Sequence, residues 1–157
     1  MNPLRRTLLQ SAGAGSALGL LLAAGLLKPT RVLAADWNRP AFTATNLGDA
    51  LKAYGAAASV EHRDIVINAA EISENGAQVP VEIISNLPGY QTIAVFVEKN
   101  PMPLAASLSF ANGAVPYVRL QLKMAESSRL RAVVRTADGK TYHASREIKV
   151  TLGGCGG

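Results

Sequence analysis

Hydrophobic and polar residues alternate along most of the chain after residue 64, and this period of two predicts β-strands. The clearest segment runs from Tyr117 to Met124, where every second residue is apolar. Asn-Gly, Asp-Gly and Pro-Gly pairs separate the segments and indicate tight turns. Short alternating segments separated by tight turns predict an all-β fold, an immunoglobulin-like antiparallel β-sandwich of about seven strands. The expected strands cover residues 64–72, 79–86, 91–98, 104–111, 115–124, 128–136 and 140–152.

One of these segments, Thr92 to Val97, is apolar on both faces of the expected strand. Two interpretations fit this pattern. Either the strand is central and is buried on both sides, by the core and by an N-terminal helix, or its outer face meets another protein. In the second case the partner interface would contain Ile93, Val95, Phe96 and Val97.

Before the first expected strand, the spacing of the apolar residues changes from that of a strand to that of a helix. Leu47, Leu51 and Tyr54 stand at i, i+4 and i+7, which predicts a short helix over residues 47–57, capped by Thr45 or Asn46. The segment from 36 to 45 is expected to be extended or irregular.

The first 34 residues have the pattern of an export signal and are set aside from the fold. The pair Arg5-Arg6 precedes a long apolar stretch, which is typical of a twin-arginine signal. Small residues favour cleavage after Ala34 or after Ala35. An uncleaved membrane anchor and a general secretory leader are the alternatives. The mature protein is therefore expected in the periplasm, without stable membrane association.

The composition and charge of the chain exclude some classes of function. The formal net charge of +5 comes mostly from the signal segment, which carries four basic residues and no acid. The rest holds 12 basic and 11 acidic residues, so its net charge is about +1. This balance argues against nucleic-acid binding, which needs a clustered basic surface. The chain has one cysteine, Cys155, so no intramolecular disulfide and no zinc site of several thiolates can form.

That cysteine stands third from the C-terminus, between two pairs of glycines: Gly153, Gly154, Gly156 and Gly157. Glycine is costly to order and offers no side chain for packing, so residues 153–157 are expected to form a flexible, exposed arm. Three residues beyond Leu152 give the thiol a reach of at most about 10 Å. A thin arm of this kind fits a narrow pocket on another protein.

The surroundings of the thiol in the sequence argue against catalysis by Cys155 itself. A cysteine nucleophile needs a positioned base or cation, and the nearest base along the chain is Lys149. Cys155 is therefore expected to be a covalent carrier site, presented to enzymes that bring their own catalytic groups. The chain has no metal site or cofactor in this interpretation.

Several alternatives use the same residues. A blue-copper site would combine Cys155 with His62, His143 and a methionine, but such sites place a histidine and the methionine shortly after the cysteine. A ubiquitin-like sulfur carrier and a single-cysteine peroxidase fit less well. An interaction module, whose Cys155 only crosslinks chains by disulfide, is the main alternative, and a tail-to-tail disulfide dimer is compatible even with a carrier.

The ending from Val150 to Gly157 resembles the SoxY family, the carrier proteins of bacterial thiosulfate oxidation. Glu74-Asn75-Gly76 with the following Val-Pro-Val, the loop Glu98 to Pro103, and Asp138-Gly139 are similar to that family as well. The resemblance covers essentially the whole of residues 35–152 and the arm. It implies a non-enzymatic carrier that holds sulfur intermediates on Cys155, with the four glycines as a swinging arm.

The resemblance also implies partners. SoxZ, a second small sandwich protein, would form a heterodimer with this chain. The cytochrome SoxAX would couple thiosulfate to the thiol as an S-thiosulfonate, and the hydrolase SoxB would release sulfate and leave a cysteine persulfide. In some organisms the dehydrogenase SoxCD would then oxidise the remaining sulfane sulfur.

Overall fold

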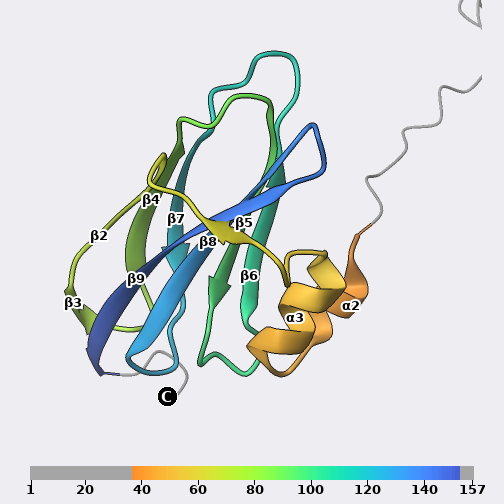
Figure 1. Ribbon diagram of the computed structural model, residues 1–157. Coiled ribbons are helices and arrows are strands. Elements are labelled where there is room, and N and C mark those ends of the chain that lie inside the picture. Colours follow the sequence, from red (N-terminus) through yellow and green to blue (C-terminus); the bar gives the residue numbers. More distant parts are fainter. Residues whose placement is uncertain (1–36, 153–157) are drawn as a thin grey trace, which may run out of the picture. The chain divides into compact units, whose positions relative to one another are not determined.

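The computed structural model describes residues 37–152 (Figure 1). The chain divides into two units, residues 1–37 and 38–157, and every described helix and strand belongs to the second. The signal residues Arg5 and Arg6, the cleavage residues Ala34 and Ala35, and the whole arm with Cys155 lie outside the described residues.

Two short helices precede the strands, α2 (Arg39–Thr43) and α3 (Leu47–Tyr54). The side chain of Asn46 accepts the backbone N–H of Asp49 and caps α3, as expected. The helix ends three residues earlier than predicted because Gly55 adopts a left-handed conformation with φ 76°. The expectation of an irregular chain before residue 46 was wrong for α2, which Asn38 caps through the N–H of Ala41.

The strands form two sheets that face each other, so the predicted all-β sandwich is confirmed (Figure 1). The larger sheet has the order β1-β9-β8-β5-β6, with β3 also paired to β9, and the smaller sheet has the order β2-β4-β7. Each of the seven expected strands is present, with ends shifted by a few residues. The strands are β1 (Val60–Glu61), β2 (Ile65–Ala69), β3 (Ile72–Asn75), β4 (Val79–Ser85), β5 (Tyr90–Val97), β6 (Leu104–Ser109), β7 (Tyr117–Leu122), β8 (Ser128–Thr136) and β9 (Thr141–Leu152).

Two of these strands were not expected, and both pair parallel to β9. β1 places Val60 opposite Tyr142, and β3 places Ile72 opposite Lys149. Between them the chain crosses to the smaller sheet as β2, which pairs antiparallel with β4. The strand expected over residues 64–72 therefore corresponds to β2, which ends at Ala69, and only its last residue, Ile72, belongs to β3. The second crossing pairs the last third of β9 with β3, beyond Ile148, where the ladder between β9 and β8 ends.

The main core lies between the sheets and is almost wholly aliphatic. Its fully buried side chains come from alternate positions of β4, β5 and β8, as the period of two requires. They include Val79, Val81, Ile83, Ile93, Val95, Val97, Leu130, Ala132 and Val134.

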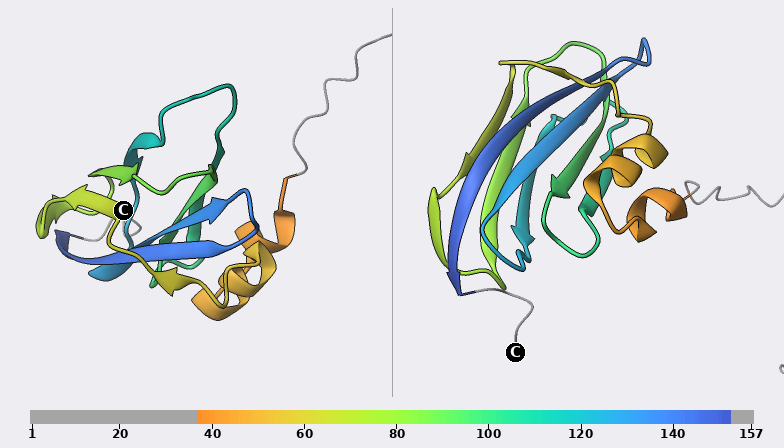
Figure 2. Two further views of the ribbon diagram at one scale, coloured as in Figure 1. Left: turned by 45° about the horizontal axis from the view of Figure 1, so that its top comes forward. Right: turned by 60° about the horizontal axis from the view of Figure 1, so that its bottom comes forward.

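A second core covers the other face of the larger sheet, where α2 and α3 pack (Figures 1 and 2). Phe96 and Ala94 lie beneath Leu51 and Tyr54 of α3, and the Tyr54 and Phe96 rings meet edge to face with centroids 5.8 Å apart. Both Phe96 and Ala94 are fully buried. The helices therefore take the place that an external partner would have occupied.

This packing decides between the two interpretations of the doubly apolar strand. Ile93, Val95 and Val97 face the main core, Phe96 faces the helices, and none of the four is exposed. The partner interface expected at these residues was wrong. The interpretation as a central strand, buried by the core and by an N-terminal helix, is confirmed.

Candidate functional site at the end of the last strand

Strand β9 carries the chain to Leu152, the last described residue before the arm. The backbone N–H of Gly76 donates to the carbonyl of Leu152 at 2.7 Å, and the carbonyl of Gly76 accepts from the N–H of Met124 at 2.7 Å. One glycine therefore ties the root of the arm to the loop that follows β7. We call this end of the sandwich, with Leu152 and the loops 76–78, 98–103 and 123–127, the arm end.

Side chains add to this bracing on both sides of β9. The Ser127 hydroxyl accepts the N–H of Val150 at 2.8 Å and lies 3.3 Å from the carbonyl of the same residue. The hydroxyl of Thr151 donates to the carbonyl of Glu74 at 3.0 Å. The root of the arm thus has fixed partners up to its last described residues.

The loop after β5 is braced to the same end by Asn100. Its Nδ2 donates to the carbonyl of Lys123 at 2.7 Å, and its Oδ1 accepts the N–H of Ala125 at 2.9 Å. Two of the segments on which the family resemblance rested, residues 74–76 and 98–103, are therefore brought together at the arm end. The third, Asp138-Gly139, lies at the opposite end of the sandwich, in the turn between β8 and β9.

Two lysines near the arm end are exposed, and each lies beside a carboxylate. Lys149 Nζ lies 4.0 Å from Glu71, and Lys99 Nζ lies 3.9 Å from Glu126. Such exposed pairs contribute little to stability. Lys149 is the base nearest to Cys155 along the chain, and its position beside Glu71 makes it a weak candidate to activate the thiol.

The candidate copper ligands do not gather near the arm. His62 follows β1 directly, His143 pairs with Glu61 in β9, and nine residues of strand separate His143 from Leu152. Nine residues of β-strand span about 30 Å, roughly three times the reach of the arm. Met124 is buried, whereas Met102 is 56% exposed. Within residues 37–152, no three His, Cys, Asp or Glu side chains come together as a metal site would require.

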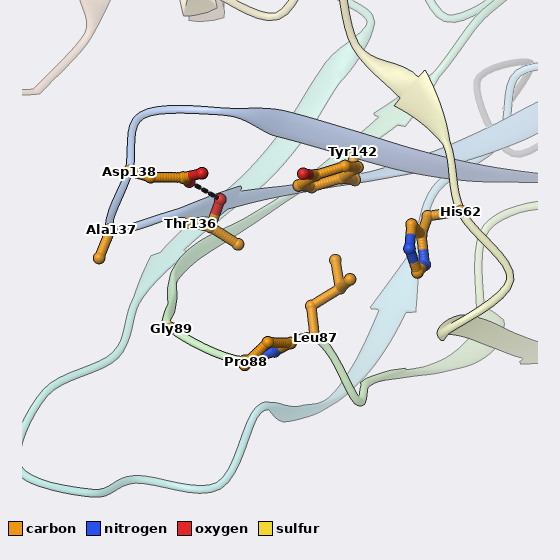
Figure 3. A pocket seen from close by; sticks show the side chains of 8 residues that line it. All are labelled: His62, Leu87, Pro88, Gly89, Thr136, Ala137, Asp138 and Tyr142. Carbon is orange, nitrogen blue, oxygen red and sulfur yellow. Dashed lines mark hydrogen bonds between the residues drawn. The ribbon is translucent and has the colours of Figure 1, made fainter.

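The end opposite the arm holds an open pocket of about 450 Å³ (Figure 3). The ring of His62 meets that of Tyr142 edge to face at 5.3 Å, and the Thr136 hydroxyl donates to Asp138 at 2.5 Å. Hydrogen bonds from Thr136 and then from Lys140 lower the pKa of Asp138 to about 2. The pocket is lined by His62, Leu87, Pro88, Gly89, Thr136, Ala137, Asp138 and Tyr142. We call this the far end, and the length of β9 separates it from the arm.

Sequence reasoning did not find the residues that brace the arm end. Gly76 was assigned only to a turn, Asn100 only to a loop, and Ser127 received no role. The sequence did contain an indication for Asn100. Pro101 and Pro103 have no backbone N–H to donate, which favours a loop that is held by a side chain such as that of Asn100.

None of the helices formed by the described residues is long and apolar enough to cross a membrane.

The fold and its last strand define a class: a small β-sandwich whose C-terminal strand leads directly into an arm with the chain's single cysteine. A family model, "Sulfur oxidation protein SoxY", matches residues 50–155. The solved structure of the sulfur carrier protein SoxY from Chlorobium limicola f thiosulfatophilum is 40% identical, covers 70% of this chain and 96% of that one, and has a TM-score of 0.61. The chain belongs to the SoxY family.

Other matches concern the fold alone. Two structures of the superoxide reductase (neelaredoxin) from Ignicoccus hospitalis are 24% and 23% identical, each with a TM-score of 0.50. They cover 57% and 56% of this chain and 82% and 80% of their own. A search of curated proteins gives no significant match.

Proposed function

We propose that this protein is a periplasmic sulfur carrier, which holds intermediates of thiosulfate oxidation covalently on Cys155 and presents them to partner enzymes. The observation that carries the proposal is the extent of the family match, which runs through residue 155, the only cysteine of the chain. The related structure from Chlorobium is that of a sulfur carrier protein. The protein is not itself an enzyme in this proposal.

The carrier chemistry balances if partners supply the redox and hydrolytic steps. The thiol of Cys155 and thiosulfate form one S–S bond, release one proton and give two electrons to the haem cytochrome SoxAX, leaving an S-thiosulfonate. Water, directed by the hydrolase SoxB, then cleaves the bond between the outer sulfur and the sulfonate, releasing sulfate and leaving a persulfide. SoxCD would oxidise that persulfide sulfur further.

The arm end suits such a carrier. The hydrogen bonds of Gly76, Ser127 and Thr151 fix the point from which the arm starts, so a partner enzyme meets a defined root. Lys149, the base nearest to Cys155 along the chain, lies beside Glu71, and oxidative coupling by a cytochrome does not require an activating base. The glycines then give the thiol its reach.

Export and assembly complete the proposal. The twin-arginine pair Arg5-Arg6 and cleavage after Ala34 or Ala35 would deliver the folded protein to the periplasm. SoxZ would be the partner in a heterodimer. Replacing both arginines with lysine should stop export, and continued export would contradict the twin-arginine route.

The carrier role is tested by intact mass spectrometry of the mature protein from thiosulfate-grown cells, kept non-reduced. We expect reducible thiosulfonate or persulfide adducts on the C-terminal peptide, and none in a Cys155→Ser variant with an unchanged urea midpoint. Ser145→Cys in that variant is the matched control: it restores a thiol at an exposed position of β9 but should not restore thiosulfate oxidation. A bare thiol throughout, or only a disulfide to a second chain, would favour the crosslinking module instead.

A further inference from the structure

The pocket at the far end is the mouth of the main core. Its walls come from three separate segments: the residue after β1, the turn between β4 and β5, and the β8–β9 hairpin. Leu87 in the wall belongs to the main core, and Tyr142 packs against that core. Leu87 and Thr136 are only 5% and 7% exposed, so the pocket reaches into the sandwich. Its volume of about 450 Å³ lies in the range of pockets that hold small molecules.

Hydrogen bonds between the wall segments hold the pocket in shape. The backbone N–H of Ala137 donates to the carbonyl of Gly89 at 2.7 Å, which joins the two turns. The N–H of Asn86 donates to the carbonyl of Asp64 at 2.8 Å, which joins the β4–β5 turn to the segment after β1. A ligand therefore meets walls that are already ordered, and its affinity is not reduced by the cost of ordering them.

The middle of the pocket is an apolar slot. The Tyr142 ring lies across the pocket from Leu87 and Pro88, with one face turned toward them (Figure 3). The ring of His62 closes one end of the slot and meets the Tyr142 ring edge to face. A flat apolar group fits between an aromatic face and aliphatic side chains, because it removes apolar surface from water on both of its sides.

The other end of the slot carries the carboxylate of Asp138 (Figure 3). This carboxylate is ionised at neutral pH, since hydrogen bonds from Thr136 and then from Lys140 lower the pKa of Asp138 to about 2. The face of an aromatic ring such as that of Tyr142 also attracts positive charge. The carboxylate and the ring together favour a cation over an anion or a neutral molecule.

A lysine already lies beside this carboxylate. Lys140 Nζ is 2.9 Å from Oδ2 of Asp138, and the side chain of Lys140 is 69% exposed. An exposed pair of this kind contributes little to stability. A ligand cation that also buries an apolar body can therefore compete with Lys140 for the carboxylate, at some loss of affinity.

We propose that the far-end pocket binds a small organic cation, an amine joined to a flat apolar body. The apolar body lies between Tyr142 and Leu87, and the amine donates to the carboxylate of Asp138. The length of β9 separates this pocket from the arm, so the proposal does not depend on the carrier role of Cys155.

The test titrates benzylamine into the mature protein with Cys155→Ser and follows the backbone amides by NMR. We expect saturable shifts at Gly89, Ala137 and Asp138, with a dissociation constant in the millimolar range that suits so small a ligand. Benzyl alcohol has a similar body without the charge, and benzoate carries the opposite charge. Both should bind at least fivefold more weakly. Shifts that do not saturate, shifts away from the far end, or equal binding of the three compounds would overturn the proposal.

Two substitutions change the affinity of the carboxylate end in opposite directions. Asp138→Asn should weaken benzylamine binding at least fivefold and leave the binding of benzyl alcohol unchanged. Lys140→Gln should tighten benzylamine binding at least twofold, because it removes the competing ammonium at an exposed position. Glu126→Gln, which removes the exposed carboxylate beside Lys99 at the arm end, is the matched control and should have no effect. Unchanged benzylamine affinity in both Asp138→Asn and Lys140→Gln would contradict the assignment of the amine to Asp138.

Discussion

The contacts within the arm end differ in chemical kind from the contacts within the far end. At the arm end, Gly76, Asn100 and Ser127 join loops and strands through backbone groups, an amide and a hydroxyl, none of which titrates near neutral pH. At the far end the corresponding contacts involve ionisable side chains, with Asp138 bound by Thr136 and Lys140, and His143 bound by Ser59.

This difference has a functional consequence. The hydrogen bonds that brace the root of the arm join uncharged groups, so neither protonation nor salt screening weakens these bonds directly. The far end can respond to pH without disturbing that root, because the length of β9 lies between them. The following predictions test the contrast, beginning with the largest effect.

Asn100→Ala should destabilise the protein by about 1–3 kcal/mol, because it leaves the Ala125 N–H and the Lys123 carbonyl without their partner. Urea denaturation monitored by circular dichroism measures the loss. The matched control is Asn68→Ala, at an exposed position of β2, which should change stability by less than about 0.5 kcal/mol. Equal losses in the two variants would mean that Asn100 does not brace the arm end.

Ser127→Ala should have a smaller effect, about 0.5–1.5 kcal/mol, since one hydroxyl is removed and water can partly replace it. The sharper measurement is hydrogen exchange at Val150, whose N–H should exchange faster in the variant. Ser145→Ala, at an exposed position of the same strand, is the control and should leave that amide unchanged. Unchanged exchange at Val150 in Ser127→Ala would contradict the contact.

The sequence predicted the strands that have at least one buried face and missed β1 and β3, which have none. Alternation reports a strand with one face in a core, and each such strand was found. β1 and β3 lie on an edge beside β9 with mostly exposed side chains, so they leave no alternating pattern. α2 is only five residues long, too short to show a helical period, and its Pro40 is tolerated because it lies in the first turn.

The candidate site was predictable only in its covalent part. A single cysteine among glycines can be read directly from the sequence, whereas the bracing by Gly76 and Asn100 depends on contacts between loops far apart in the chain. The strand around Phe96 shows the same limit. Its pattern indicates two apolar faces, but only the packing of α3 shows what covers the second.

At the far end, the lowered pKa of Asp138 makes the stability of the protein depend on pH in the acid range. Its pKa of about 2 in the folded protein lies below the ordinary 3.8, so the stabilising contribution is complete above about pH 4 and is lost as the pH falls toward 2. Thermal unfolding of the wild type should show this decrease, and Asp138→Asn should reduce it. Glu126→Gln at the arm end is the control. An identical acid response in Asp138→Asn and the wild type would contradict the assignment.

His143 should give the smallest effect, closer to neutral pH. Burial, and then the positive charge of Arg131, lower the pKa of His143 below its ordinary 6.5. The folded protein therefore favours the neutral ring, so stability is constant above pH 6.5 and decreases as the pH falls below it, until the ring is protonated in the folded state as well. His143→Gln should flatten the melting temperature between about pH 7.5 and 5.5 relative to the wild type. His62→Gln is the matched control at the same end, and equal flattening of the curve in His62→Gln would contradict the assignment to His143. The protection factor of the Val150 amide, which is its exchange rate corrected for the intrinsic pH dependence of exchange, should not change over this range in any of these proteins, because its partner Ser127 carries no charge.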